Sequence, residues 1–167
     1  MSMTITGDMG DNLDRFTKDT RTAAKHALEV AALALLDDSI NEVPQVPYME
    51  GTLRGSGSVH VDGDLKATSK DLGHTAPDAT PVIESLAGAI TPNQLTLEML
   101  VAVIGFNSPY AAYQHEGVRA DGSHPVRQYT SSGSGRKFLE TPLFTNAERY
   151  FVVMGTEYQQ RMKELGW

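Results

Sequence analysis

The chain has 167 residues, of which 40% are hydrophobic and 21% charged, and its formal net charge is -7. This is the size of one domain, and the composition is typical of a globular protein rather than a disordered one. The absence of cysteine excludes disulfides and thiolate metal sites, and an acidic chain with scattered basic residues is poorly suited to binding nucleic-acid phosphates. Residues 1–12 do not resemble a secretory signal, and the longest apolar run, 99–106, is far too short to span a membrane.

Residues 1–11 are predicted to form a flexible N-terminal arm, because most of the first ten are small or polar and two of them are glycines. The remainder, residues 12–167, is expected to form a single domain. A long helix is predicted from Asn12 to about Ile40, with Asp11 or Asn12 as its cap. Its buried face should be formed by apolar residues that recur at spacings of three, four and seven: Leu13, Phe16, Ala23, Ala27, Val30, Ala31, Ala34 and Leu35.

The middle of the chain predicts two strands and a long loop. A short strand is expected over 58–61, followed by an Asp-Gly turn at 62–64. Residues 63–93 are rich in proline, glycine and small polar residues, which indicates a long loop. The segment 95–106 is apolar at nearly every position and should form a central strand covered on both faces.

The last third predicts two helices around a second loop. A short helix is expected over 110–115 and a long loop over 118–136. Thr141-Pro142 should open a single final helix from 143 to 165, because proline is well tolerated in the first turn. Its buried stripe is predicted from the helical spacing of its apolar residues, namely Phe144, Ala147, Phe151, Met154 and Tyr158.

Sites for catalysis or metal binding are weakly indicated. His115-Glu116 begins like the zinc-protease motif, but the second histidine of that motif would fall at Arg119. A metal-dependent hydrolase built from His115, Glu116 and His124 therefore stays as a minor alternative. The glycine-rich segment 131–137 fails the phosphate-loop pattern because its lysine is followed by Phe138. No catalytic residue, metal or cofactor is expected.

Two carboxylate pairs, Asp37-Asp38 and Asp62/Asp64, are expected to be solvated because they lie at a helix end and a turn. The stretch 109–117, PYAAYQHEG, instead has the character of a surface that binds other proteins. Within it, Glu116 is either an ordinary helix-end carboxylate or the partner of a salt bridge to a neighbouring subunit, and both alternatives stay open.

Three segments, in this order, together resemble a known family. They are residues 47–56 (PYMEGTLRGS), 108–117 (SPYAAYQHEG) and 136–143 (RKFLETPL). The chain resembles the small neck proteins of long-tailed bacteriophages, called head–tail connector or tail-completion proteins, over about residues 12–160.

The resemblance implies an α+β fold, with a small antiparallel sheet flanked by a long N-terminal helix and a C-terminal helix, and with long loops. It also implies a homo-oligomeric ring with sixfold symmetry, located in the neck of the virion after assembly in the host cytoplasm. The implied partners are portal, adaptor or stopper proteins on one side and tail terminator or tail tube protein on the other. A tail terminator, a minor capsid subunit or a tail tube subunit are the alternatives.

DNA would pass through the lumen of such a ring without sequence-specific binding, and an acidic lumen would prevent it from sticking. The residues expected to form subunit contacts are Tyr110, Tyr113, Glu116 and Arg119, since tyrosine and arginine are favoured at interfaces. Phe138 and Leu139 complete this set of six candidate interface residues, and they are expected to attach the second loop to the core.

Overall fold

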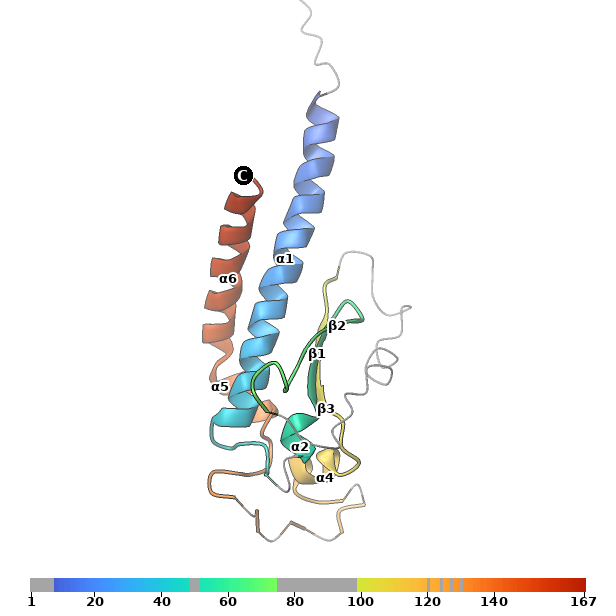
Figure 1. Ribbon diagram of the computed structural model, residues 1–167, viewed down its shortest axis with the longest axis vertical. Helices are drawn as coiled ribbons and strands as arrows, with labels where there is room; N and C mark the ends of the chain where they lie inside the picture. The colour runs from blue at the N-terminus through green and yellow to red at the C-terminus, as the bar shows by residue number, and fades with distance from the viewer. Residues whose placement is uncertain are drawn as a thin grey trace, which may run out of the picture.

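A computed structural model describes residues 8–48, 52–74, 99–119, 121–123, 125–126, 128–129 and 131–167. The long helix α1 (Asp8–Asn41) lies between the C-terminal helix α6 (Ala147–Glu164) and a small sheet (Figure 1). The sheet contains β1 (Gly57–Val61), β2 (Asp64–Thr68) and β3 (Ala102–Phe106), all antiparallel, in the order β2-β1-β3. The predicted α+β fold is confirmed.

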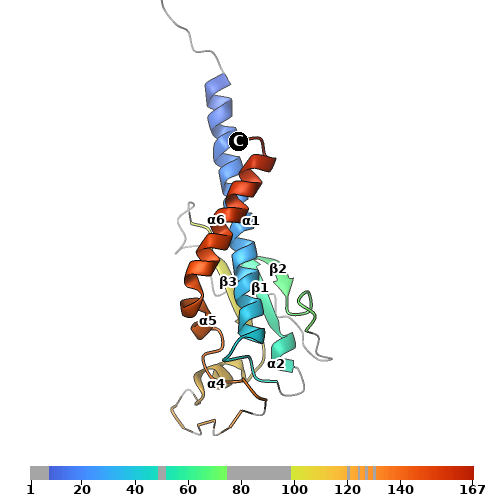
Figure 2. The same cartoon turned by 90° about the vertical axis from the view of Figure 1, so that its left-hand side faces the viewer.

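The C-terminal half of α1 supplies one side of the core. Figure 2 shows it crossing in front of the sheet. The predicted buried face is confirmed here for Ala23, Ala27, Ala31 and Leu35, whereas Val30 and Ala34 are only half-buried. Nearer the N-terminus the prediction was wrong: Leu13 is 63% exposed and Phe16 42% exposed, since that part of α1 extends beyond the sheet (Figure 1). The buried positions of α1 with apolar side chains are Ala23, Ala27, Ala31, Ala32, Leu35, Leu36 and Ile40.

The start of α1 also differs from the prediction. The helix begins at Asp8, so residues 8–11 of the predicted arm are helical and the expected cap at Asp11 or Asn12 was wrong. Residues 1–7 lie outside the described structure.

Among the strands that the structure describes, β1 is central and buried along its whole length, and β3 lies at the edge of the sheet. The prediction of a central strand over 95–106 was therefore wrong in position, and the strand covers only 102–106, with 95–98 outside the described residues. Strand β2 occupies part of the predicted loop 63–93, whose residues 75–93 are not described. Its sequence, DLKAT, alternates polar and apolar residues as a half-buried strand does, and the prediction of a loop missed this signal.

The predicted turn between β1 and β2 is confirmed. Asp62 and Gly63 have φ values of 52° and 85°, which is the pattern of a two-residue type I′ hairpin turn. At the other end of β1, a Cβ on Gly57 would lie 2.8 Å from Leu36 Cδ1 and 2.9 Å from Phe106 Cε1. Only glycine therefore allows α1 and β3 to approach the strand this closely.

The predicted short helix is confirmed as α4 (Ala111–Glu116), and α2 (Thr52–Gly55) places Leu53 in the core. The predicted single C-terminal helix was wrong, because α5 (Glu140–Thr145) and α6 are separated at Asn146. The Asn146 side chain donates from Nδ2 to Asp38 Oδ2 at 3.0 Å and to Glu42 Oε2 at 2.7 Å. The break therefore places an amide against the end of α1.

Asp38 is buried, so the expectation that it is solvated was wrong. Its Oδ2 also accepts hydrogen bonds from the Arg149 guanidinium and, at 2.5 Å, from the Tyr150 hydroxyl. Burial raises the pKa of Tyr150, and the hydrogen bond to Asp38 raises it further. Helix α6 is thus tied to α1 through one carboxylate with several donors.

The predicted buried stripe of the last helix was partly wrong. Tyr150 and Met162 are the buried apolar side chains of α6, and Ala147, Met154 and Tyr158 are half-buried. Phe144 and Phe151 are exposed, at 73% and 71%. Two large aromatic side chains therefore remain available on the surface.

Candidate interaction surfaces

The first candidate surface is a shallow hollow of about 210 Å³ beside α4, which we call the α4 hollow. Three of the six predicted contact residues, Glu116, Phe138 and Leu139, come together here. The full lining is Phe106, Ala111, Ala112, His115, Glu116, Phe138 and Leu139.

Phe138 forms the floor between this hollow and the core. It is buried, and its ring packs edge-to-face on Phe106 at 5.5 Å and on His115 at 4.9 Å between centroids. Leu139 packs against the same core cluster. Both positions agree with the expected attachment of the second loop to the core.

Glu116 forms its ion pairs within its own chain, with Lys137 and His115. Its Oε2 lies 2.8 Å from Lys137 Nζ, and its Oε1 lies 3.1 Å from His115 Nδ1. The hydrogen bond with Lys137, and after it the one with His115, lowers the pKa of Glu116. In turn, the hydrogen bonds of Lys137 with Glu116 and then Glu140 raise the pKa of Lys137. The carboxylate therefore belongs to a local, exposed charge cluster, which could orient a neighbour but adds little stability.

The other predicted contact residues surround this cluster without all joining it. Tyr110 is half-buried and packs on the core, and Tyr113 is half-buried on α4. Arg119 is exposed, and its backbone N–H donates to Ser123 O at 3.1 Å in a turn. Of this set, only Arg119 and Glu116 are mainly exposed, and the role of all six in subunit contacts stays a prediction.

The second loop is held against α4 by backbone hydrogen bonds. Val126 N–H donates to Gly117 O at 2.8 Å, and Lys137 N–H donates to His115 O at 2.7 Å. The Tyr129 hydroxyl donates to Gln114 O at 2.9 Å. The described residues of 118–136 contain no helix, and their one bridge joins Ser134 to Gln45, so the predicted loop is confirmed over that part.

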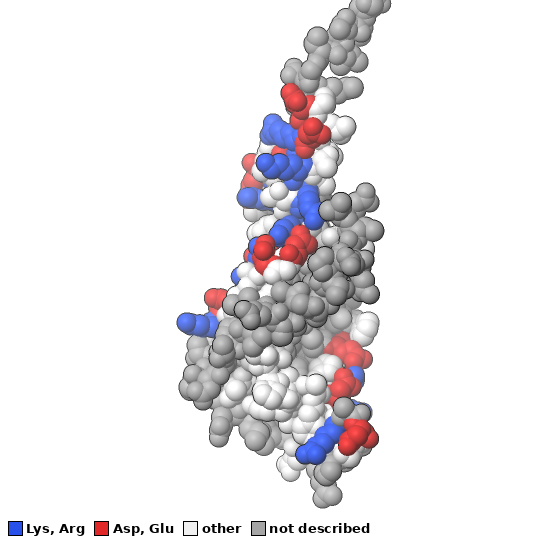
Figure 3. All heavy atoms as spheres, turned by 90° about the vertical axis from the view of Figure 1, so that its right-hand side faces the viewer, with Lys and Arg blue, Asp and Glu red and all other residues white. Residues whose placement is uncertain are grey.

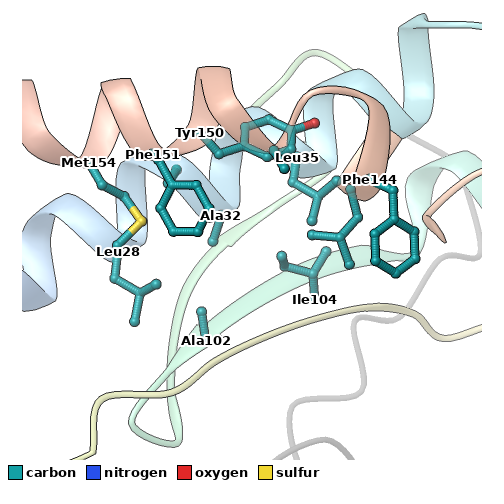
Figure 4. Close-up of a pocket in the computed structure, with 12 residues that line it drawn as sticks. Leu28, Ala32, Leu35, Ala102, Ile104, Phe144, Tyr150, Phe151 and Met154 are labelled. Atoms are coloured by element: carbon teal, nitrogen blue, oxygen red, sulfur yellow. The ribbon is translucent and has the colours of Figure 1, made fainter. Parts of the chain in front are cut away.

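The second candidate surface is an apolar groove between α1, β3 and the α5–α6 segment, with a volume of about 410 Å³. Figure 4 shows Phe144 and Phe151 on one side of it and Ala102 and Ile104 of β3 on the other. Its lining is almost entirely apolar: Leu28, Ala31, Ala32, Leu35, Ala102, Ile104, Leu143, Phe144, Ala147, Tyr150, Phe151 and Met154. We call it the β3 groove.

The backbone of β3 adds directional groups to this groove. Two hydrogen bonds at the ends of the β1–β3 ladder show which residues of β3 bond to β1. Asp62 N–H donates to Val101 O, and Asn107 N–H donates to Ser56 O, so the residues of β3 bonded to β1 are those at odd-numbered positions. By antiparallel alternation, the N–H and C=O groups of Ala102, Ile104 and Phe106 point away from β1, toward the edge of the sheet beyond which no described strand lies. Ala102 and Ile104 therefore present groove-lining side chains and outward backbone groups together.

The sequence did not reveal the β3 groove. Phe144 and Phe151 were assigned to a buried stripe because a continuous helix would place them seven residues apart on one face. The helix is instead broken at Asn146, and Tyr150 points toward α1, where its hydroxyl donates to Asp38. The signal that could have indicated this is the Asn-Ala-Glu sequence at 146–148, which resembles a helix start.

Charge is mixed along the exposed part of α1. Figure 3 shows Lys and Arg interspersed with Asp and Glu over the upper part of the molecule. Residues 11–25 include three aspartates and four basic residues, at positions 11, 14 and 19 and at 15, 18, 21 and 25. This segment is therefore close to neutral, and the acidic excess of the chain lies elsewhere.

Within the residues that the structure describes, no group of three His, Asp or Glu side chains could hold a metal ion. His124, part of the minor hydrolase alternative, lies outside those residues. Among the described helices, none combines the length and the apolar character needed to cross a membrane. Comparisons of the chain with protein-family models, curated proteins and solved structures find no match.

Proposed function

We propose that the protein is a structural subunit of a bacteriophage neck, where copies of it form a ring that joins the head to the tail and keeps the DNA channel continuous. The observation that carries the proposal is the β3 groove, whose rim exposes Phe144 and Phe151. An apolar surface with aromatic rims is typical of a protein contact site.

The kind of assembly follows from the family resemblance and from the presence of two unlike surfaces. A cyclic ring needs head-to-tail contacts, in which each subunit uses one surface on each side. The β3 groove is apolar, whereas the α4 hollow is bordered by the charged group Glu116, Lys137 and Glu140. Two surfaces of different chemistry suit a heterologous contact better than a two-fold one.

The proposed channel imposes a condition on charge. The mixed charges of residues 11–25 make this part of α1 a poor lining for a channel that repels DNA. We expect the lumen to be lined by acidic residues from other parts of the chain. A basic lumen in an imaged assembly would contradict this expectation.

Electron microscopy of labelled virions tests the proposal. The chain would carry a small C-terminal peptide tag in the phage that encodes it, and gold-labelled antibody would mark its position. We expect label at the junction of head and tail in each particle. Label along the tail would indicate a tube subunit, label over the capsid would indicate a capsid subunit, and particles without label would contradict a structural role.

A further inference from the structure

We propose that the β3 groove binds the N-terminal segment of a second copy of this chain, with residues 1–7 adding as a strand to the edge of β3 that pairs with no strand among the described residues. The inference deepens the proposed ring and depends on it for the identity of the assembly, but not for the contact itself. It starts from the chemistry of the groove and from the sequence of the segment.

The segment has the alternation of a strand with one apolar face. Residues 1–6 are Met-Ser-Met-Thr-Ile-Thr, so apolar side chains occur at 1, 3 and 5 and small hydroxyl side chains at 2, 4 and 6. Successive side chains of a strand point to opposite faces, which would place Met1, Met3 and Ile5 together. Methionine is also well suited to filling irregular apolar space.

The groove offers what such a strand needs. The outward N–H and C=O groups of Ala102, Ile104 and Phe106 can pair with an added strand, as in other cases where a peptide extends a sheet. Side chains of an added strand that lie beside Ala102 and Ile104 share their face of the sheet. They would therefore enter the β3 groove, opposite Phe144 and Phe151 (Figure 4).

The segment cannot reach the groove of its own chain. The nearest groove residue on α1 is Leu28, twenty residues after Asp8, which is about 30 Å along a helix. Seven fully extended residues reach at most about 25 Å, and α1 points away from the groove along its axis (Figure 1). The occupant must then come from another copy.

The same reach restricts how subunits are arranged. Consider a neighbouring subunit at the same height in the ring, with its α1 parallel to that of the first subunit. Its residues 1–7 would lie as far from the first subunit's β3 groove as the first subunit's own residues 1–7 do. The contact therefore requires α1 to be inclined along the ring toward the next subunit. In that arrangement the segment and the groove are two different surfaces of each subunit, as a head-to-tail ring requires.

Disulfide trapping tests the contact, and the natural absence of cysteine makes it clean. One chain carries Ala102→Cys, and a separately purified chain carries one cysteine at position 2, 3, 4, 5 or 6. Because each chain has a single cysteine, every mixed disulfide joins two copies. The chains are mixed at high concentration under mild oxidation, and the yield of mixed dimer is measured for each position.

We expect yields at positions 3 and 5 to exceed those at 2, 4 and 6 by about tenfold, because disulfides form only at short, well-directed Cβ separations. Ser132→Cys, an exposed loop position outside the groove lining, replaces Ala102→Cys as the collision control. Yields that do not alternate, or that do not exceed this control, would overturn the proposal. If the natural occupant of the groove is instead an apolar ligand or a different protein, we expect yields no higher than those of the collision control.

The two proposals fail separately. Alternating yields together with virions that carry no label at the neck would leave the strand exchange standing and end the neck function. Label at the neck without alternating yields would do the reverse. A chain with Ile5→Asp should lose trapping at position 3, whereas Thr4→Asp, on the opposite face, should keep it.

Discussion

The two halves of α1 differ in what supports them. Residues 23–40 pack on the sheet and on α6, and their buried face includes Leu36 and Ile40 at the centre of the core. Residues 8–22 extend past the sheet (Figure 1). They are contacted by the end of the chain, where the Trp167 ring packs edge-to-face on Phe16 at 5.1 Å, and by the β1–β2 turn, where Asp62 Oδ2 lies 3.5 Å from Arg21 Nη2. One continuous helix is thus both a core element and a projecting arm, and each role predicts a different response to mutation.

The largest loss of stability is expected in the core that residues 23–40 of α1 cover. Phe138→Ala removes a buried ring that packs on Phe106 and His115, and we expect it to lower the free energy of unfolding by about 3–5 kcal/mol. Urea unfolding followed by circular dichroism measures this change. A loss below about 1 kcal/mol would mean that the 136–143 segment does not belong to the core.

The second effect concerns the junction of α1 and α6. Asp38→Asn removes the charge that accepts from Arg149, Tyr150 and Asn146, and we expect a loss of about 2 kcal/mol in the free energy of unfolding. The neighbouring Asp37→Asn is the matched control, because Asp37 accepts one exposed bond from Asn41 and should change stability by less than about 0.5 kcal/mol. Equal losses of stability in the two variants would contradict the role of Asp38 in holding α6 against α1.

A smaller and local effect is expected at the projecting half. Trp167→Ala removes the contact with Phe16, the hydrogen bond from Trp167 Nε1 to Asp19 at 3.0 Å and the stacking of Arg15. We expect the local free energy of opening of residues 8–20 to fall by about 1 kcal/mol. Amide hydrogen exchange measures this change, and it should become faster in residues 8–20 with little change in residues 30–40. Faster exchange throughout α1 would show that the two halves open together.

The smallest effect is expected at the exposed cluster beside α4, and it depends on pH. Because Lys137 lowers the pKa of Glu116 below its ordinary 4.5, the stability from this pair is present above pH 4.5 and is lost as pH falls through the lower value. Glu116→Gln should therefore be slightly less stable than the natural chain at pH 7, and this difference should narrow as the pH falls toward 3. Thermal midpoints at the two pH values measure the difference, and a gap that persists at pH 3 would assign it to another cause.

The sequence predicted the elements whose own pattern determines them. Apolar spacing gave the long helix, alternation gave β1, and the Asp-Gly pair gave the hairpin turn. Phe138 and Leu139 were correctly predicted to attach the second loop to the core. These features depend on neighbours in the sequence, which is why they could be found without the structure.

The features that the sequence did not reveal depend on contacts between distant segments. The burial of Asp38 is explained by donors more than a hundred residues away, and the break at Asn146 belongs to the same cluster. The edge position of β3 depends on which strands pair, since an apolar run suits a central strand equally well. The β3 groove follows from both, so it could not be predicted either.

The most direct measurement is the size of the assembly formed by a chain whose groove is made charged. Phe144→Asp with Phe151→Asp alters two exposed rims and should leave the fold intact, and Val152→Asp is the control because Val152 is 62% exposed on α6 outside the groove lining. By multi-angle light scattering at high concentration, we predict a ring-sized assembly for the natural chain and for the control, and a monomer for the double variant. A double variant that assembles like the natural chain, or a natural chain that stays monomeric, would contradict the groove as the contact between copies.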